Sequence, residues 1–273
     1  MKKLYFTKMQ SLGNDFVIID QLKNPIKFSK NDIKKISNRN YGIGCDQVLV
    51  LEKSEKKEIA FKYKIYNKDG TESGQCGNGA KCIGKYYFDK YGKNRKEIKI
   101  ETISRRMSLR ILKNSLIEVD MGLPLFNFKE YKSSKNIFNF KGKKHYFSAI
   151  SIGNPHAVFF IKNINKVDLA DFANNFNKKL FFNGDVNISI VEEIKKNNWL
   201  ARIYERGAGE TMACGSAACA ISLSTSTIKD ISSKNNYVHM HGGKAQVKWS
   251  GNITEPVYLI GSSQYVFDGN YKI

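Results

Sequence analysis

The chain has 273 residues, 41% of them hydrophobic and 26% charged, a composition typical of a soluble globular protein with one large or two ordinary domains. No apolar run approaches the roughly 18 residues that a membrane helix needs, and residues 1–16 lack the apolar core of a signal peptide. The net charge of +20 would suit nucleic-acid binding, but the lysines are scattered along the chain. We therefore attribute the charge to compositional drift and expect no nucleic-acid or membrane partner.

The expected elements follow from alternating and continuous runs of β-branched and aromatic residues. These runs predict strands at 16–20, 47–52, 60–66, 97–102 and 115–121. A short helix is expected at 32–40, and two longer ones over 77–92 and 215–228. The lysine-rich stretch 129–144 is the expected inter-domain segment.

Several short sequences occur twice at a nearly constant spacing. The SLGN of 11–14 recurs as the SIGN of 151–154, an offset of 140. The cysteine-glycine turn at Cys76 recurs at Cys214, an offset of 138. We therefore predict two homologous halves that face each other about a pseudo-twofold axis. Each half is expected to be an α/β domain in which a mixed, mostly antiparallel sheet wraps around one central helix.

Both repeated cysteines are expected at the first turn of a helix. Unpaired amide groups and the helix dipole favour a thiolate there, so the pKa of such a cysteine can fall from about 8.5 to 7 or below. The same amides bind carboxylates, and the glycine after Cys76 or Cys214 lets a ligand approach the backbone. Two equivalent thiols suit a reaction that needs a base on one side of a carbon and an acid on the other, such as inversion of a Cα–H centre.

Alternative functions of the cysteines have to be weighed against an acid/base pair. Cys82 and Cys219 lie six and five residues after the repeated cysteines, which is not the usual spacing of zinc ligands. A Cys–His–Asn hydrolase would need one nucleophile where the repeat supplies two. A thiol redox protein and a basic nucleic-acid-binding protein also remain as alternatives. The odd total of five cysteines favours free thiols in a reducing cytoplasm.

The motifs resemble those of the diaminopimelate epimerase family over nearly the whole chain. The matching stretches are LGNDFVIID, GIGCDQ, YNKDGTESGQCGNGAKC, VDMGLP, SIGNPHAV, YERGAGETMACGSAACA and VFDG. The resemblance implies conversion of LL-2,6-diaminopimelate to the meso form in lysine and peptidoglycan precursor synthesis, with no cofactor and no metal. It also implies a homodimer, and a first domain of 1–122 completed by 263–273, with 123–262 as the second. A proline or hydroxyproline racemase, which shares this fold and also uses two cysteines, is the nearest alternative.

The resemblance also implies roles for individual residues. Cys76 and Cys214 match the acid/base pair, and His156 and Glu205 match residues that tune those thiols. The positions that match substrate-binding residues are Asn14, Gln47, Asn67, Gly77, Asn78, Asn154, Asn187, Glu205, Arg206, Gly215 and Ser216.

The chain departs from the family pattern in a few places. Ser216 and Ala217 stand where threonine and glycine are usual, and the serine keeps the hydroxyl. Phe267 stands where a tyrosine at the dimer contact is often found, so its ring can pack but cannot donate a hydrogen bond. We expect these changes to affect dimer strength more than catalysis.

Overall fold

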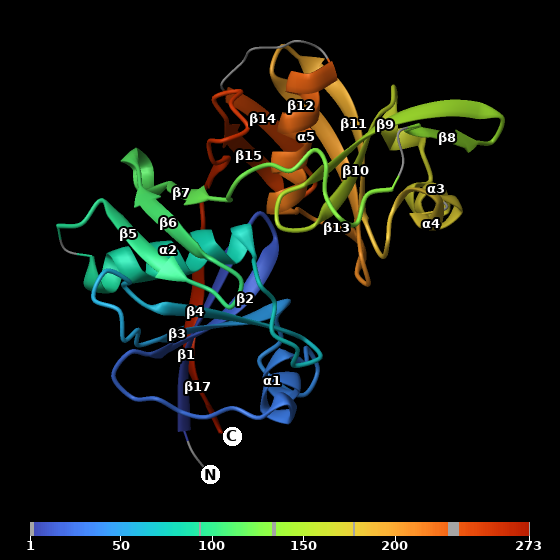
Figure 1. Ribbon diagram of the computed structural model, residues 1–273. Helices are drawn as coiled ribbons and strands as arrows, with labels where there is room; N and C mark the ends of the chain where they lie inside the picture. Colours follow the sequence, from blue (N-terminus) through green and yellow to red (C-terminus); the bar gives the residue numbers. More distant parts are fainter. Residues whose placement is uncertain (1–2, 93, 133–134, 177, 229–234, 273) are drawn as a thin grey trace. The chain divides into compact units, whose positions relative to one another are not determined.

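The structure, a computed structural model, describes residues 3–92, 94–132, 135–176, 178–228 and 235–272. The chain forms two compact units (Figure 1). Unit 1 comprises Met1–Asp120 and Ile260–Ile273, and unit 2 comprises Met121–Leu259. Each unit is a mixed α/β domain with one long helix, so the expected fold class is confirmed.

The described residues of unit 1 form eight paired strands. In chain order its elements are β1 (Lys3–Ser11), β2 (Asn14–Gln21), α1 (Lys30–Ser37), β3 (Gln47–Glu52), β4 (Lys62–Asn67), α2 (Gly77–Tyr91), β5 (Glu97–Glu101), β6 (Arg106–Ile111), the 3-10 turn η1 (Lys113–Ser115), β7 (Ile117–Asp120) and β17 (Gln264–Lys272). Pairing gives the order β17-β1-β2-β3-β4-β5-β6-β7, in which only β2–β3 and β4–β5 are parallel.

Helix α2 forms the centre of unit 1. It contacts β1, β2 and β3 as well as β6 and β7, strands that lie far apart in the sheet order, so the sheet curves around it. Its sequence carries three glycines, which are poor helix formers, so burial must stabilise it. A Cβ on one of them, Gly84, would come within 3.2 Å of Leu109 and Ile117, so glycine allows strands to pack closely against the helix.

Strand β3 is buried on both faces, which explains its unbroken apolar run. Val48 and Val50 pack with Ile33 and Ile36 of α1. Leu49 points the other way, toward the first turn of α2. Helix α1 begins at a capping box in which Ser29 and Asp32 exchange hydrogen bonds, so it starts two residues before the expected 32–40.

Unit 2 contains the remaining elements. They are β8 (Ile137–Phe140), β9 (Lys143–Ser151), β10 (Pro155–Phe160), the 3-10 turn η2 (Ile164–Lys166), α3 (Leu169–Asn175), α4 (Lys178–Phe181), β11 (Asn187–Lys195), β12 (Asn198–Glu205), β13 (Gly209–Thr211), α5 (Gly215–Ile228), β14 (Asn235–Met240) and β15 (Gly243–Lys248). The next strand, β16 (Tyr258–Gly261), begins in unit 2, and its last two residues belong to unit 1. Helix α5 contacts β9, β10, β11, β14 and β15.

The two sheets repeat one pattern of pairing. Along β1-β2-β3-β4-β5-β6 and along β9-β10-β11-β12-β14-β15, neighbours alternate antiparallel, parallel, antiparallel, parallel, antiparallel. The register also agrees, because Phe16 pairs with Gln47 in unit 1 and His156 pairs with Asn187 in unit 2, each partner 140 positions on.

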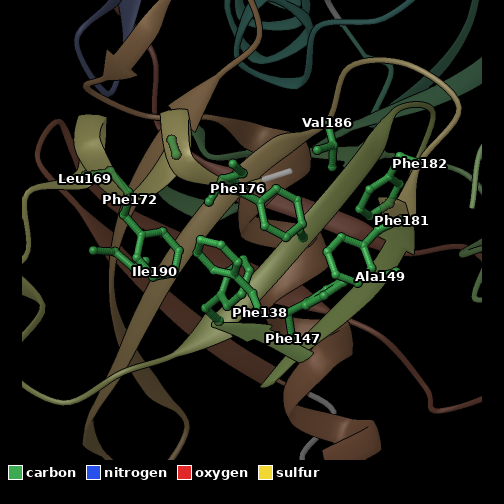
Figure 2. Close-up of a cluster of buried hydrophobic side chains, with 14 of the residues drawn as sticks. Phe138, Phe147, Ala149, Leu169, Phe172, Phe176, Phe181, Phe182, Val186 and Ile190 are labelled. Atoms are coloured by element: carbon green, nitrogen blue, oxygen red, sulfur yellow. The ribbon is translucent and has the colours of Figure 1, made fainter. Parts of the chain in front are cut away.

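A cluster of phenylalanines fills the side of the unit 2 sheet that α3 and α4 cover. Figure 2 shows Phe138, Phe147 and Phe176 gathered there with their neighbours. Phe172 is fully buried and meets Phe138 edge-on, with ring centroids 5.2 Å apart. The stretch 129–144, expected to join the domains, instead lies inside unit 2 and contributes Phe138 to this cluster, because its alternating apolar residues form β8.

Replacing Phe172 with alanine should destabilise unit 2 by roughly 3–5 kcal/mol, because a large buried ring is lost and a cavity remains. Urea unfolding followed by tryptophan fluorescence measures this unit selectively, since both tryptophans, Trp199 and Trp249, belong to it. Leu180→Ala is the control: its side chain is 64% exposed, so the unfolding midpoint should barely move. Equal effects of the two changes would contradict the packing described.

Candidate active site

Cys76 lies at the N-terminus of α2 and caps it with sulfur. Its Sγ accepts the backbone N–H of Gly79 at 3.3 Å, where an oxygen caps most helices. Its carbonyl accepts the N–H of Ala80 at 2.8 Å, so the helix begins directly at the cysteine. The thiol is therefore surrounded by the positive ends of first-turn amide dipoles.

The Tyr63 side chain packs beneath this turn. Its hydroxyl lies 3.5 Å from the carbonyl oxygen of Cys76, and a Cβ at Gly79 would come within 2.4 Å of it, so only glycine fits there. At an offset of 138, the counterparts of Tyr63 and Gly79 are Ala201 and Ala217. The tyrosine and glycine that pack together in unit 1 thus correspond to two alanines in unit 2.

Three predicted binding residues of unit 1 lie at one edge of its sheet. β2 begins at Asn14, β3 begins at Gln47 and β4 ends at Asn67, which pairs with Gln47. The Asn14 amide donates from Nδ2 to Asp46 Oδ2 at 2.8 Å. Gln47 donates from Nε2 to Asn67 Oδ1 at 2.9 Å, and Asn67 donates to Thr71 Oγ1 at 3.1 Å.

A network of charges supports this edge. Asp46 pairs with Arg39 at 3.0 Å and with Lys68 at 3.1 Å. Beside it, Asp15 pairs with Arg39 and with the buried Lys8, each at 2.6 Å. Burial acts to raise the pKa of Asp15, but hydrogen bonds and charge from these two cations lower that pKa to about 2. The carboxylate therefore stays ionised and holds the strand ends together.

Cys214 precedes α5 as Cys76 precedes α2, but its surroundings differ. Its sulfur lies 3.4 Å from Ser216 Oγ, and both the Glu205 carboxylate and the backbone N–H of Ala217 act on its pKa. Burial, reinforced by the negative charge of Glu205, raises the pKa of the Cys214 thiol well above its usual range. The expected lowering of the thiol pKa at a helix start is therefore wrong for Cys214, because desolvation and a carboxylate outweigh the amides.

Glu205 is held in place at the end of β12. The Thr211 hydroxyl donates to Glu205 Oε1 at 2.7 Å. Strand β13 brings Thr211 back beside β12, with Gly209 paired to Glu205. The tight hairpin of the ERGAGET motif thus fixes the carboxylate that contacts the Cys214 thiol.

His156 is fully buried at the start of β10. Burial, followed by the positive charge of Arg206, lowers the pKa of His156 to about 3, so the ring is neutral. Its Nε2 lies 3.1 Å from Asn154 Oδ1, whereas Nδ1 has no hydrogen-bond partner among the residues the structure describes. Asn187, at the start of β11, accepts the backbone N–H of Arg206 at 3.0 Å through Oδ1.

The predicted site residues thus fall into two sets, one in each unit. Unit 1 holds Cys76, Gly77, Asn78, Asn14, Gln47 and Asn67, and unit 2 holds Cys214, Gly215, Ser216, His156, Asn154, Asn187, Glu205 and Arg206. In both sets the polar strand ends and the helix start belong to equivalent elements.

Sequence reasoning missed the residues that support these sets. Asp46 directly precedes Gln47, and Thr211 belongs to the ERGAGET motif, so the position of each next to a predicted site residue or inside a motif could have identified it. Thr71 follows Asp69 and Gly70 in a turn sequence, which signals local structure and not a contact with Asn67. Tyr63 occupies an ordinary position of a strand, and nothing in the sequence marks it.

Unit 2 also has an open cavity of about 460 Å³. None of the predicted site residues lines it; its walls are Asn165, Val167, Arg202, Glu210, Thr211, Met212 and His241. Arg202 binds both oxygens of Glu210, at 2.7 and 2.8 Å, and donates to the carbonyls of Ile164 and Val167. Four of the five guanidinium N–H groups are therefore used within the protein.

Two further observations concern the described part of the chain. None of its helices is long and apolar enough to cross a membrane. Its His, Cys, Asp and Glu side chains form no group of three or more that could hold a metal ion.

Comparison with known sequences gives matches over almost the whole chain. A model of the family described as diaminopimelate epimerase matches residues 6–126 and 148–266. A diaminopimelate epimerase of Blochmanniella floridana is 38% identical over 97% of this chain and 98% of its own length. One from Buchnera aphidicola subsp. Acyrthosiphon pisum (strain 5A) is 37% identical over 98% of this chain and 96% of its own.

Comparison with solved structures shows the same fold in distant proteins. A hydroxyproline epimerase of Agrobacterium vitis, solved with bound trans-4-hydroxy-L-proline, superposes with a TM-score of 0.72. The match covers 98% of this chain and 92% of that chain at 10% sequence identity, so it concerns the fold alone.

Replacing Glu205 with glutamine should lower the pKa of the Cys214 thiol, because one of the two causes that raise it is removed. Alkylation of Cys214 by iodoacetamide, followed by peptide mass spectrometry as a function of pH, should reach its half-maximal rate at a lower pH in this variant. Glu255→Gln makes the same change on an exposed loop and should leave the profile unaltered. A Glu205→Gln profile that coincides with wild type would show that the carboxylate does not act on the thiol.

Proposed function

The chain belongs to the diaminopimelate epimerase family and is an isomerase, and on this basis we propose that it converts LL-2,6-diaminopimelate to the meso form with two cysteines. The observation that carries the proposal is the equivalence of Cys76 and Cys214. Each cysteine carbonyl accepts the N–H four residues further on, from Ala80 to Cys76 at 2.8 Å and from Ala218 to Cys214 at 3.0 Å, in units that share one pattern of strand pairing. Two equivalent thiols match a reaction that moves one proton off a carbon and another onto it.

In the proposed reaction one thiolate takes the Cα proton and the electron pair stays on carbon. The other thiol then delivers its proton to the opposite face, so the centre is inverted and no electron is gained or lost. The first cysteine ends as a thiol and the second as a thiolate. Cys214, whose pKa is raised, holds its proton in the substrate-free protein, which suits it to the acid role while Cys76 acts as base. No cofactor takes part.

Backbone amides at the two helix starts are proposed to bind the carboxylate next to the reacting carbon. Gly77 and Asn78 open α2, and Gly215 and Ser216 open α5. First-turn N–H groups of a helix have no intrahelical acceptor and favour anions. Binding there also stabilises the negative charge that develops as the proton leaves.

The far end of the substrate is assigned to unit 2. Arg206 is exposed there, and a guanidinium can hold a carboxylate through two hydrogen bonds. A cyclic imino acid such as proline has no second carboxylate for Arg206 to bind. This residue therefore favours diaminopimelate over proline or hydroxyproline.

We also propose that units 1 and 2 descend from one duplicated domain. The shared order and sense of strand pairing supports this, as does the equal register of β2–β3 and β10–β11.

A reaction that yields meso-diaminopimelate supplies lysine and peptidoglycan precursor synthesis, and we propose that the enzyme acts in the cytoplasm.

Loss of either thiol should slow epimerisation strongly. In D₂O the wild type should introduce deuterium at the inverted Cα, whereas Cys76→Ala and Cys214→Ala should each be slower by roughly 10²–10⁴-fold, the contribution of a positioned acid or base. Cys219→Ala removes a buried thiol of α5 outside the site and should keep wild-type turnover. Near-normal inversion by either single-thiol variant would rule out the two-thiol mechanism.

A homodimer is proposed through β17. This strand pairs with β1 on one side, and its residues are largely exposed. Val266 and Phe267 are 54% and 49% exposed, and the Phe267 ring meets Phe6 with centroids 5.8 Å apart. An exposed strand with apolar side chains is a surface that a second copy can cover.

Phe267→Lys should shift the protein from dimer toward monomer, because it places a charge in the proposed contact of a chain that already carries +20. Light scattering during gel filtration measures the mass directly. Tyr146→Lys, at a 67% exposed aromatic residue of unit 2, should leave the mass unchanged. If the Phe267 variant keeps the wild-type dimer mass at all dilutions, the contact lies elsewhere.

A further inference from the structure

We propose that Asp46 and Asp69, two carboxylates outside the predicted binding set, fix the side-chain amides of Asn14 and Gln47 so that both present carbonyl oxygens to an ammonium group of the substrate. This rests on the proposed function and extends it to specificity. An amide side chain offers a donor at one end and an acceptor at the other. Whichever end the protein binds, the opposite end is left for a ligand.

Asp46 decides the orientation of Asn14. An ionised carboxylate only accepts hydrogen bonds, so the group of Asn14 that lies 2.8 Å from Asp46 Oδ2 must be its NH₂. Turning the amide around would place two acceptor oxygens against each other. Asp46 Oδ2 also accepts the backbone N–H of Asp15 at 3.2 Å, which holds the carboxylate in place. Asn14 therefore presents Oδ1.

Asp69 decides the orientation of Gln47 through a relay. Asp69 Oδ1 accepts the Thr71 hydroxyl at 2.6 Å and the Thr71 backbone N–H at 2.9 Å, so the hydroxyl proton is committed to the carboxylate. Thr71 Oγ1 can then only accept, and Asn67 donates to it at 3.1 Å. This turns Asn67 Oδ1 toward Gln47, which donates at 2.9 Å and presents Oε1.

The equivalent amide in unit 2 is fixed in the opposite sense. Asn187, the counterpart of Gln47, is bound at Oδ1 by the backbone N–H of Arg206 and so presents its NH₂. At this position unit 2 therefore offers a donor, which suits a carboxylate, where unit 1 offers an acceptor, which suits an ammonium. Which end of each side-chain amide is left for a ligand depends on the group that binds the other end. That group is an acceptor for Gln47 in unit 1 and a donor for Asn187 in unit 2.

Asp46 and Asp69 act through other residues and are positioning residues. The second oxygen of Asp46 is taken up by Arg39 and Lys68, at 3.0 and 3.1 Å. These cations also determine what an asparagine at position 46 would do. They would keep its oxygen, so its NH₂ would face Asn14 and turn that amide around.

The test compares Asp46→Asn with Thr71→Val in the full-length protein. Both should raise the KM for LL-2,6-diaminopimelate, about five- to tenfold for Asp46→Asn and about two- to fivefold for Thr71→Val, the effect of one lost hydrogen bond to the substrate. The kcat should stay within about twofold, because the ammonium contact is made equally in ground and transition states. Inhibition by pimelate, which has both carboxylates and no ammonium, should not weaken in either variant.

Glu52→Gln is the matched control. It neutralises a carboxylate at the far end of β3 whose partner is Lys64, and should change neither constant. Unchanged KM in both test variants, or equal weakening of substrate and pimelate, would overturn the inference. The split between KM and kcat decides the matter if pimelate binds too weakly to measure. A wild type that does not epimerise diaminopimelate would instead refute the proposed function.

Discussion

The position of a cysteine directly before a central helix is the constraint on which the arrangement of the predicted site residues in each unit depends. The carbonyl of Cys76 accepts the N–H of Ala80 at 2.8 Å, and the carbonyl of Cys214 accepts the N–H of Ala218 at 3.0 Å. Each cysteine is therefore held by the first turn of the helix that follows it. The glycine after each cysteine, Gly77 or Gly215, lets a ligand approach the backbone, and the strands around each helix bring polar side chains to that end.

The shared frame is filled differently in the two units, and this gives the thiols different electrostatics. Unit 1 places the Tyr63 hydroxyl beneath the cysteine turn, and unit 2 has Ala201 at that position. Unit 2 places Glu205 against its thiol where unit 1 has Asn67. The two sulfurs belong to equivalent positions before α2 and α5, but only in unit 2 does a carboxylate, Glu205, reinforce burial in raising the pKa of the thiol.

Much of this could be predicted from the sequence because the signals are local. The cysteine-glycine turns, the helices behind them and the strands at 16–20 and 47–52 follow from composition and spacing, although the first of these strands begins two residues earlier, at Asn14. Local signals failed where several distant groups act together. The pKa of the Cys214 thiol depends on burial and on a carboxylate nine residues away in the sequence. In the segment 129–144 the many lysines suggested a linker, but the alternating Phe138 and Phe140 belong to a strand, β8.

Strand β17 has a consequence for biosynthesis. It belongs to unit 1, where it pairs with β1 from Lys3–Lys272 to Gln10–Gln264, yet it follows every residue of unit 2 in the chain. On the ribosome, the domain begun first is therefore completed last, and β1 must wait with an open edge while unit 2 emerges and folds. A nascent chain stalled before Gln264 would therefore expose that edge of β1 to pairing with other strands.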